Sequence, residues 1–215
     1  MQRLLHFCSE DLGAFYLDIL KDRLYTTAAG SHARRSAQSA LHEIARTLLQ
    51  LFSPVLTFTA DEAWAVLMRD PEATVFTTTW EPVADTPVDP ALEARWASVR
   101  EVRALVLKEL EALRTAGSIG SGLAAEVEVQ ASGDTCDALA ALGEDLRFVF
   151  ITSAAAVVRT ADGSVPAVSA VASAGAKCAR CWHYRADIGG HADHPEVCGR
   201  CAQNLAGAGE VRVHA

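Results

Sequence analysis

Four of the six cysteines stand in two C-x-x-C pairs, Cys178 with Cys181 and Cys198 with Cys201, and sixteen residues separate the pairs. This spacing is typical of a four-cysteine zinc site, because each pair turns the chain tightly enough to direct two thiolates at one ion. Four thiolates complete the tetrahedral coordination of Zn²⁺ and leave no position for water or substrate. The sequence therefore predicts one structural zinc ion, whose binding free energy stabilises a segment too small to bury a core of its own.

The same cysteines could instead form two disulfides or stay as free thiols. Disulfides persist mainly in exported proteins, and residues 1–5 begin a helix-like pattern without a long apolar run or a small-residue cleavage site. Zinc in a reducing cytoplasm is therefore the favoured interpretation. Three histidines between the pairs, His183, His191 and His194, could replace a cysteine ligand, but four thiolates already satisfy the ion.

Cations and aromatic rings crowd the first cysteine pair. The residues concerned are Lys177, Arg180, Trp182, His183, Tyr184 and Arg185. Such a surface suits single-stranded nucleic acid, whose bases stack on aromatic rings while Arg or Lys contacts phosphate or base edges. The alternative is that Trp182 and Tyr184 pack over the zinc as a minimal core. The residues alone leave both interpretations open.

Composition restricts the partners. The chain has 215 residues, half of them apolar, with a net charge of −8, which allows one or two domains. Indiscriminate nucleic-acid binding, including DNA binding, is not expected because it needs a broad basic field. From Lys177 onward, however, five Lys or Arg face four Asp or Glu. No apolar run approaches the roughly 20 residues that cross a bilayer, so no membrane partner is expected.

Helical periodicity dominates the first part of the chain. Apolar residues recur at three- and four-residue steps over residues 4–27 and 32–52, and Thr59 with Glu62 fits a capping box for a third helix. Gly30 suits a left-handed cap after the first helix. Short connections make an antiparallel helical bundle the expected fold. Residues 75–80 should be extended, and the three prolines of residues 81–90 indicate a connector.

The second part alternates between element types. The patterns predict a long helix over 90–115 ended by Gly117, a strand at 125–130, a short helix at 136–142, a strand at 148–151, an unstructured tether at 164–176 and a last strand at 211–213. The fold class is therefore mainly α, with a small α/β unit and a four-cysteine zinc finger. Cys8 and Cys136 stand alone in apolar surroundings and are expected to be buried thiols.

Several segments together resemble bacterial isoleucyl-tRNA synthetase. Residues 15–25 (FYLDILKDRLY), 34–38 (RRSAQ) and 54–64 (PVLTFTADEAW) are similar to its tRNA anticodon-binding region. Residues 177–184 (KCARCWHY) and 198–201 (CGRC) look like its carboxy-terminal zinc finger, and residues 146–153 (LRFVFITS) fit the segment between. The likeness covers essentially the whole chain in the family's order.

The resemblance implies a division of labour. Residues 1–85 would be the helical anticodon-binding domain, 86–165 a long helix with a small α/β junction unit, and 177–215 the zinc finger. The helices would clasp the anticodon stem of isoleucine tRNA, with Arg34 and Arg35 as phosphate contacts. Arg180 and Trp182 would meet bases of the anticodon loop. For Arg34 and Arg35 a solvated basic turn is an equal alternative, and Lys21, Asp22 and Arg23 are expected to form a local ion-pair cluster.

The family's catalytic signatures do not occur in these residues. H-I-G-H and K-M-S-K-S are absent, as are a glycine-rich phosphate loop, G-x-S-x-G and H-E-x-x-H. No catalytic residue is therefore predicted, and ATP and Mg²⁺ would act only through a separate catalytic part of the synthetase. By the resemblance, anticodon contacts would hold the tRNA in register for that distant site.

Two other functions compete with this interpretation. DNA repair glycosylases carry a similar four-cysteine hairpin, but they use an amino-terminal proline followed by glutamate, and this chain opens Met1-Gln2-Arg3. A zinc-containing protein-interaction adapter would be compatible with the net acidity. A failure to bind any RNA at low salt would favour the adapter.

Overall fold

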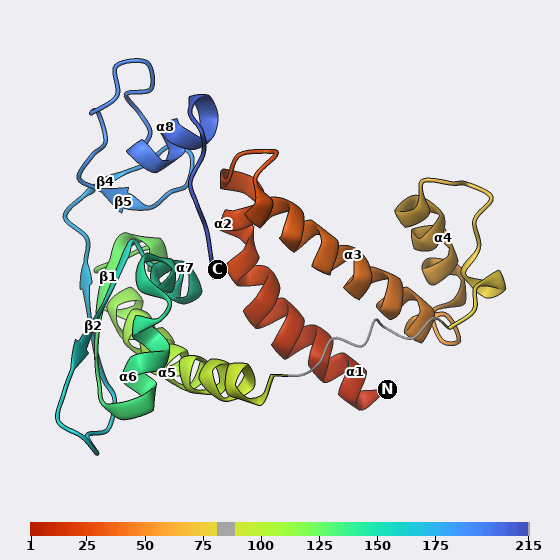
Figure 1. Cartoon of the computed structure of the whole chain (residues 1–215), viewed down its shortest axis with the longest axis horizontal. Coiled ribbons are helices and arrows are strands. Elements are labelled where there is room, and N and C mark those ends of the chain that lie inside the picture. Colours follow the sequence, from red (N-terminus) through yellow and green to blue (C-terminus); the bar gives the residue numbers. More distant parts are fainter. Residues whose placement is uncertain (81–88, 215) are drawn as a thin grey trace. The chain divides into compact units, whose positions relative to one another are not determined.

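The computed structural model describes residues 1–80 and 89–214 (Figure 1). The chain divides into two compact units: Met1–Ala33 together with the chain from Asp89 onward, and Arg34–Val88. Most of the predicted connector at 81–90 lies outside the described residues. The three-part division into 1–85, 86–165 and 177–215 stays a prediction.

A continuous helical run opens the first unit. It comprises α1 (Gln2–His6), the π-helical segment η1 (Phe7–Leu17) and α2 (Asp18–Thr26), as the periodicity predicted. Its end is fixed by Thr26 and Thr27, whose hydroxyls donate to backbone carbonyls four residues earlier at 2.7 and 2.6 Å. Thr27 then turns to an extended conformation. The predicted left-handed cap at Gly30 is wrong, because Gly30 has no positive φ; the threonine side chains satisfy carbonyls at this end instead.

The second unit contains α3 (His32–Phe52, beginning two residues before the unit), α4 (Thr57–Met68) and the 3₁₀ turn η2 (Val75–Thr77). The capping box at Thr59 is wrong: α4 begins two residues earlier, after Leu56, without a side-chain cap. Asp61 on α4 instead accepts hydrogen bonds from Thr74 Oγ1 at 2.5 Å and from the Val75 amide at 3.1 Å. These bonds tie the following loop, predicted to be extended, into a 3₁₀ turn.

The longest helix, α5 (Pro90–Thr115), has the predicted bounds. Asp89 caps its first turn by accepting a hydrogen bond from the Ala91 amide at 2.9 Å, and Pro90 lies at the first helical position, where no amide is needed. Gly117 follows the last turn with φ of 71°, a left-handed conformation that favours glycine.

A three-stranded mixed sheet packs against this helix. Its order is β2 (Ala154–Arg159), β1 (Ala125–Ala131) and β3 (Ala167–Ala172), with β2 parallel and β3 antiparallel to the central β1. Helix α6 (Gly133–Ala140) and helix α7 (Leu146–Phe150) lie between β1 and β2 in the chain. Short 3₁₀ turns occur at Gly122–Ala124 and Gly143–Asp145.

Two sequence-based expectations for the α/β part of this unit are wrong. Residues 148–151 do not form a strand, because Phe148, Val149 and Phe150 belong to α7 and are buried in the core. Residues 164–176 are not a plain tether, because they include β3. In both segments tertiary pairing decides the outcome: the parallel β1–β2 pair needs a crossover between its strands, and the open edge of β1 pairs with a weakly patterned Ala/Val/Ser strand.

One face of the sheet is covered and the other is not. Along β1, buried Val127 and Val129 alternate with Glu128 and Gln130, which are exposed, and α5 and α6 lie on the covered side (Figure 1). The core formed there also takes in Ile19 from α2. This core holds the amino-terminal helix to the α/β part within the first unit.

The zinc-finger segment completes the first unit. It contains a two-stranded ribbon, β4 (Ala176–Lys177) with β5 (Tyr184–Arg185), and helix α8 (Gly199–Ala206). The predicted strand at 211–213 does not form. Among the described helices, none combines the length and the apolarity that a membrane crossing requires.

Candidate zinc centre and nucleic-acid interface

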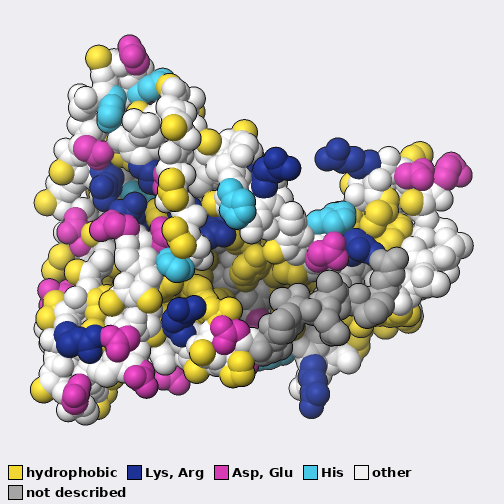
Figure 2. Space-filling model, viewed as in Figure 1, with side chains coloured by type: hydrophobic (Ala, Val, Ile, Leu, Met, Phe, Trp, Pro, Cys, Tyr) yellow, Lys and Arg dark blue, Asp and Glu magenta, His cyan; other side chains and the backbone are white. Residues whose placement is uncertain are grey.

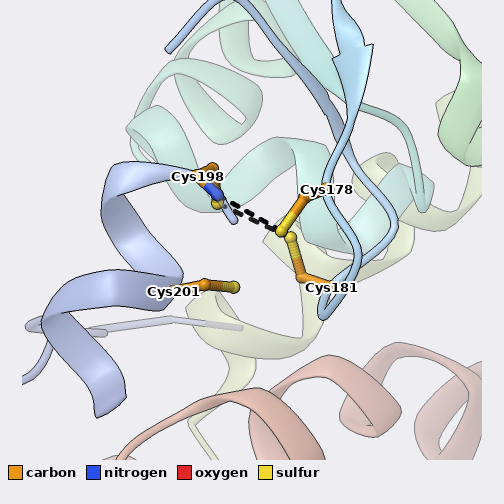
Figure 3. Close-up of side chains that lie close together, drawn as sticks. All are labelled: Cys178, Cys181, Cys198 and Cys201. Atoms are coloured by element: carbon orange, nitrogen blue, oxygen red, sulfur yellow. Dashed lines mark hydrogen bonds between the residues drawn. The ribbon is translucent and has the colours of Figure 1, made fainter. Parts of the chain in front are cut away.

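The four predicted ligands come together at one place (Figure 3). Cys178 follows β4, Cys181 lies in the turn before β5, Cys198 is the residue before α8, and Cys201 lies in the first turn of α8. All four are buried, and their Sγ atoms lie within 4.8 Å of one another. The cluster is therefore built from a tight ribbon and a helix start that the rest of the chain brings side by side.

Backbone amides shape both pairs. The Trp182 amide donates to the Cys178 carbonyl at 3.0 Å, and Trp182 takes a left-handed φ of 66° that closes the turn. The Cys198 amide donates to Cys178 Sγ at 3.3 Å. An amide directed at sulfur stabilises the thiolate form, as does the amino-terminal end of α8 beside the second pair.

The geometry fits zinc and excludes a disulfide between Cys181 and Cys198. Cys181 Sγ and Cys198 Sγ are 3.7 Å apart, far beyond the roughly 2.05 Å of a disulfide. A tetrahedron with Zn–S bonds of about 2.3 Å has edges of about 3.8 Å. All four cysteines are free thiols. The cluster therefore fits one structural Zn²⁺ held by Cys178, Cys181, Cys198 and Cys201.

The thiols influence one another strongly. Hydrogen bonds from Cys181 and Cys201 lower the pKa of Cys198 to about 3. Hydrogen bonds with Cys181 and Cys198 raise the pKa of Cys201, because they favour its neutral form. The protein alone thus stabilises part of the thiolate charge, and a dication is needed for all four sulfurs to ionise together.

Trp182 is exposed at the surface of this centre rather than packed over it. Its exposed fraction is 58%, and Lys177 Nζ lies 5.2 Å from its ring centroid. His183 lies in a loop, as expected, but its side chain is buried: its Nδ1 lies 3.3 Å from the Cys181 carbonyl, and its ring makes a T-shaped contact with Phe148. A histidine thus serves as the core residue of the knuckle while the tryptophan faces solvent.

Arg180 contacts the end of α2. Its Nη1 donates to the Thr26 carbonyl at 2.5 Å and its Nη2 to the Tyr25 carbonyl at 3.4 Å. Arg180, Trp182 and the exposed Tyr25 line one mainly apolar cavity of about 520 Å³, with α2 on one side and the finger on the other. The structure thus brings Arg180 and Trp182 together.

Arg34 and Arg35 lie in the first turns of α3, in the second unit. Arg35 is exposed and lines a shallow depression with Gln38, Ser39 and His42. Arg34 is half-buried. Both belong to a different unit from Arg180 and Trp182.

Asp22 has a larger role than the sequence indicated. It was expected in a local cluster with Lys21 and Arg23, but Lys21 pairs with Asp18 at 2.8 Å. Asp22 instead pairs with Arg200 at 2.7 Å and also with Arg212. The partners lie more than 170 residues away, so no local spacing reveals them.

Of the two remaining cysteines, Cys136 is buried as expected and Cys8 is only half-buried.

Comparison with known proteins agrees with both parts of the chain. Residues 1–129 match the family described as the anticodon-binding domain of tRNA ligase, and residues 175–204 match the zinc finger found in FPG and IleRS. The chain belongs to the family of tRNA-ligase anticodon-binding domains. The zinc finger alone would not separate this chain from DNA glycosylases, because its family includes both kinds of protein. The match of residues 1–129 to the anticodon-binding domain does separate them.

Isoleucine–tRNA ligases of bacteria are similar to the whole chain. The protein from Azoarcus sp. (strain BH72) is 54% identical over all of this chain and 23% of its own length. That from Bordetella parapertussis is 53% identical, again over all of this chain and 23% of the relative. That from Paraburkholderia phytofirmans is 55% identical over 98% of the chain. The chain thus corresponds to the anticodon-binding domain and zinc finger of these ligases and spans less than a quarter of their length.

Proposed function

We propose that the chain binds the anticodon stem-loop of isoleucine tRNA and positions it for ATP-dependent aminoacylation. ATP and Mg²⁺ would be bound by a catalytic part of the ligase that these 215 residues do not contain. Membership of the anticodon-binding family supports tRNA as the partner. Binding energy gained at the anticodon would serve to hold the acceptor end in register at a distant reaction site. Such a protein would act in the cytoplasm.

One observation carries the proposal: an exposed aromatic ring stands beside cations on a rigid, zinc-held turn. Trp182 offers a stacking plane for an unpaired loop base, and Lys177 and Arg180 flank it. Arg180 uses two donors on the Thr26 and Tyr25 carbonyls. A guanidinium carries five N–H groups, so donors remain for RNA.

Arg34 and Arg35 would contact the sugar–phosphate backbone. They stand at the amino-terminal end of α3, where the helix dipole also favours phosphate. Such contacts fix the position of the RNA without reading its sequence. The acidic net charge is not spread evenly over the chain: in the first unit, Lys and Arg side chains gather between the finger and the sheet, with Asp and Glu beside them (Figure 2).

Binding of the zinc-loaded chain to isoleucine tRNA tests the proposal, with a tRNA of altered anticodon as competitor at two salt concentrations. We expect a clear preference for the isoleucine anticodon. Trp182→Ala should weaken binding by about 5- to 100-fold, the usual effect of losing one base stack. Trp80→Ala removes another exposed tryptophan and should leave binding unchanged. Equal, steeply salt-dependent binding to both tRNAs would contradict anticodon recognition.

A further inference from the structure

The finger and the main core share few apolar contacts. The finger's own cluster consists of the four cysteines with Ile188 and Val197 against it, and it is separate from the core of α5 and the sheet. Its placement on the rest of the unit must therefore depend largely on polar contacts. Some of these contacts come from the finger itself, through Arg180, Tyr184 and Arg200. The others come from residues 208–214, called the strap below, which follow α8.

Arg212 is the centre of the strap. Its side chain is fully buried, and its guanidinium lies 3.4 Å from the ring centroid of Phe148 on α7. It pairs with Asp22 on α2 and lies 4.0 Å from an Asp145 oxygen. One side chain of the strap thus contacts two helices of the main body.

Hydrogen bonds fix the strap on either side of Arg212. Asp145 Oδ2 accepts the amides of Val213 and His214 at 3.1 and 2.8 Å. On the finger side, Glu210 and Asn204 of α8 exchange two bonds, at 2.9 and 3.0 Å. The strap therefore joins α8 at one end to the start of α7 at the other.

Asp22 is where the finger, the strap and α2 meet. Arg200 of α8 donates two hydrogen bonds to the Asp22 carboxylate, from Nη1 at 2.7 Å and from Nη2 at 2.8 Å. Arg200 also forms an ion pair with Glu210 at 3.1 Å. Burial by itself would raise the pKa of Asp22, but the Arg200 hydrogen bonds and the charges of Arg200 and Arg212 hold it below its usual value. Asp22 is therefore ionised at neutral pH.

Such a network is a costly way to gain stability and a good way to fix one geometry. Removing charges from water offsets most of their mutual attraction, and apolar replacements often stabilise a protein equally well. A bidentate arginine–carboxylate pair, however, tolerates only a narrow range of positions. Within the described residues, Asp22 is held by two arginines that arrive from different segments. This arrangement allows the finger only one position against α2, called its seat below.

We propose that Arg212 and Asp22 are positioning residues that hold the zinc finger at one fixed place on α2, with the strap as the connecting element. The consequence for RNA rests on the proposed function: Trp182 presents its face correctly only when the finger is seated. Arg212 acts without contacting RNA, since its side chain is buried. Loss of the pair should release a finger that is still folded.

Residue-resolved hydrogen exchange on the full zinc-loaded chain tests seating without RNA. The Tyr184 amide donates to Ser153 Oγ across the contact between finger and core, whereas the Trp182 and Ala202 amides bond within the finger. In Arg212→Ala we expect at least about tenfold faster exchange at Tyr184, with Trp182 and Ala202 still protected and zinc retained. Arg159→Ala is the matched control, because this substitution also removes one positive charge and breaks one ion pair, the exposed pair with Asp137.

Binding of isoleucine tRNA by the same variants is the second measurement. Arg212→Ala should weaken binding several-fold more than Arg159→Ala, and Arg212→Lys should recover part of the loss. Combining Asp22→Ala with Arg212→Ala should add little to either single change, because either one opens the same seat. If the parent chain binds no tRNA, the proposed function fails, while the exchange measurement still decides on seating.

Three results would overturn the seat. Unchanged Tyr184 protection in Arg212→Ala would show that other contacts place the finger. An effect on tRNA binding no larger than that of Arg159→Ala would reduce the role of Arg212 to net charge. Loss of zinc and of the core unfolding transition in both Arg212→Ala and Arg212→Lys would make Arg212 a folding residue and not a positioning one.

Discussion

Single residues in this protein act mainly through charge compensation. The four thiols need a dication before all can ionise, and Asp22 needs the two arginines that reach it. In both places a buried charge is stable only while its partners stay in position. Substitutions at these residues should therefore have large effects.

Cys181→Ser should remove zinc and unfold the finger while the helices remain folded. Serine is a poor zinc ligand, and the small finger cluster cannot replace the metal with a core of its own. Zinc content should fall from about one ion per chain to none, and exchange protection at Ala202 should be lost. Cys136→Ser, a buried thiol outside the cluster, is the control and should keep its zinc. A Cys181→Ser chain that retains the ion would contradict the assignment.

Asp22→Asn should destabilise the first unit by about 3 kcal/mol at neutral pH, because two arginines lose their buried counter-charge. The folded-state pKa of Asp22 is lowered, so its contribution is fully present above the unfolded value of about 4 and is lost as pH falls through the folded value. Urea unfolding of parent and variant should therefore converge in acid. A difference that is constant with pH would contradict the ionic origin.

At the scale of elements, a few residues at helix ends define where the helices start and stop. The chain stops α2 with threonine hydroxyls, starts α5 with an aspartate and ends it with a left-handed glycine. The threonine hydroxyls and the aspartate carboxylate hydrogen-bond to backbone groups at these helix ends, and the glycine lets the chain turn away from the helix. Because α5 lies against the sheet, its end also sets where the chain enters β1.

Gly117→Ala should cost about 1 kcal/mol of unfolding free energy, since alanine is strained at φ of 71°. A Cβ at this position would meet open space, so the cost is conformational and not steric. Gly120→Ala is the matched control: it also has open space and no positive φ, and it should change stability by less than about 0.5 kcal/mol. Equal effects of the two substitutions, in chemical unfolding, would contradict the role of the left-handed turn.

At the scale of the whole molecule, stability comes from two different sources. The α5–sheet core is apolar, whereas the finger depends on the metal and the Asp22 network. Removal of the metal should therefore unfold the finger and leave the α5–sheet core folded. The same separation would divide tRNA contacts into those that need the finger and those that do not.

Chelation of zinc should abolish discrimination between isoleucine tRNA and an altered-anticodon tRNA while a weaker, salt-dependent affinity remains. The finger would lose the rigid display of Trp182, and contacts from Arg34 and Arg35 would survive. Binding titrations before and after chelation, and again after zinc is restored, measure this directly. Full discrimination in the metal-free chain would contradict a reading role for the finger.

The sequence by itself determined the features that depend on local spacing. The two C-x-x-C pairs specified the zinc site, the 3.6-residue periodicity specified the amino-terminal helices and α5, and Pro90 and Gly117 bounded α5. The resemblance of several motifs in order also identified the family. These signals are readable because the interacting residues are close in the chain.

Tertiary structure decided the features that depend on distant partners. Phe148 looked like a strand residue and is helical because the core and the β1–β2 crossover require it, and the weak Ala/Val/Ser segment became β3 because β1 offered an open edge. Asp22 looked local and instead joins α2 to Arg200 and Arg212. No local pattern encodes such contacts, since their free energy exists only once the chain has brought the partners together.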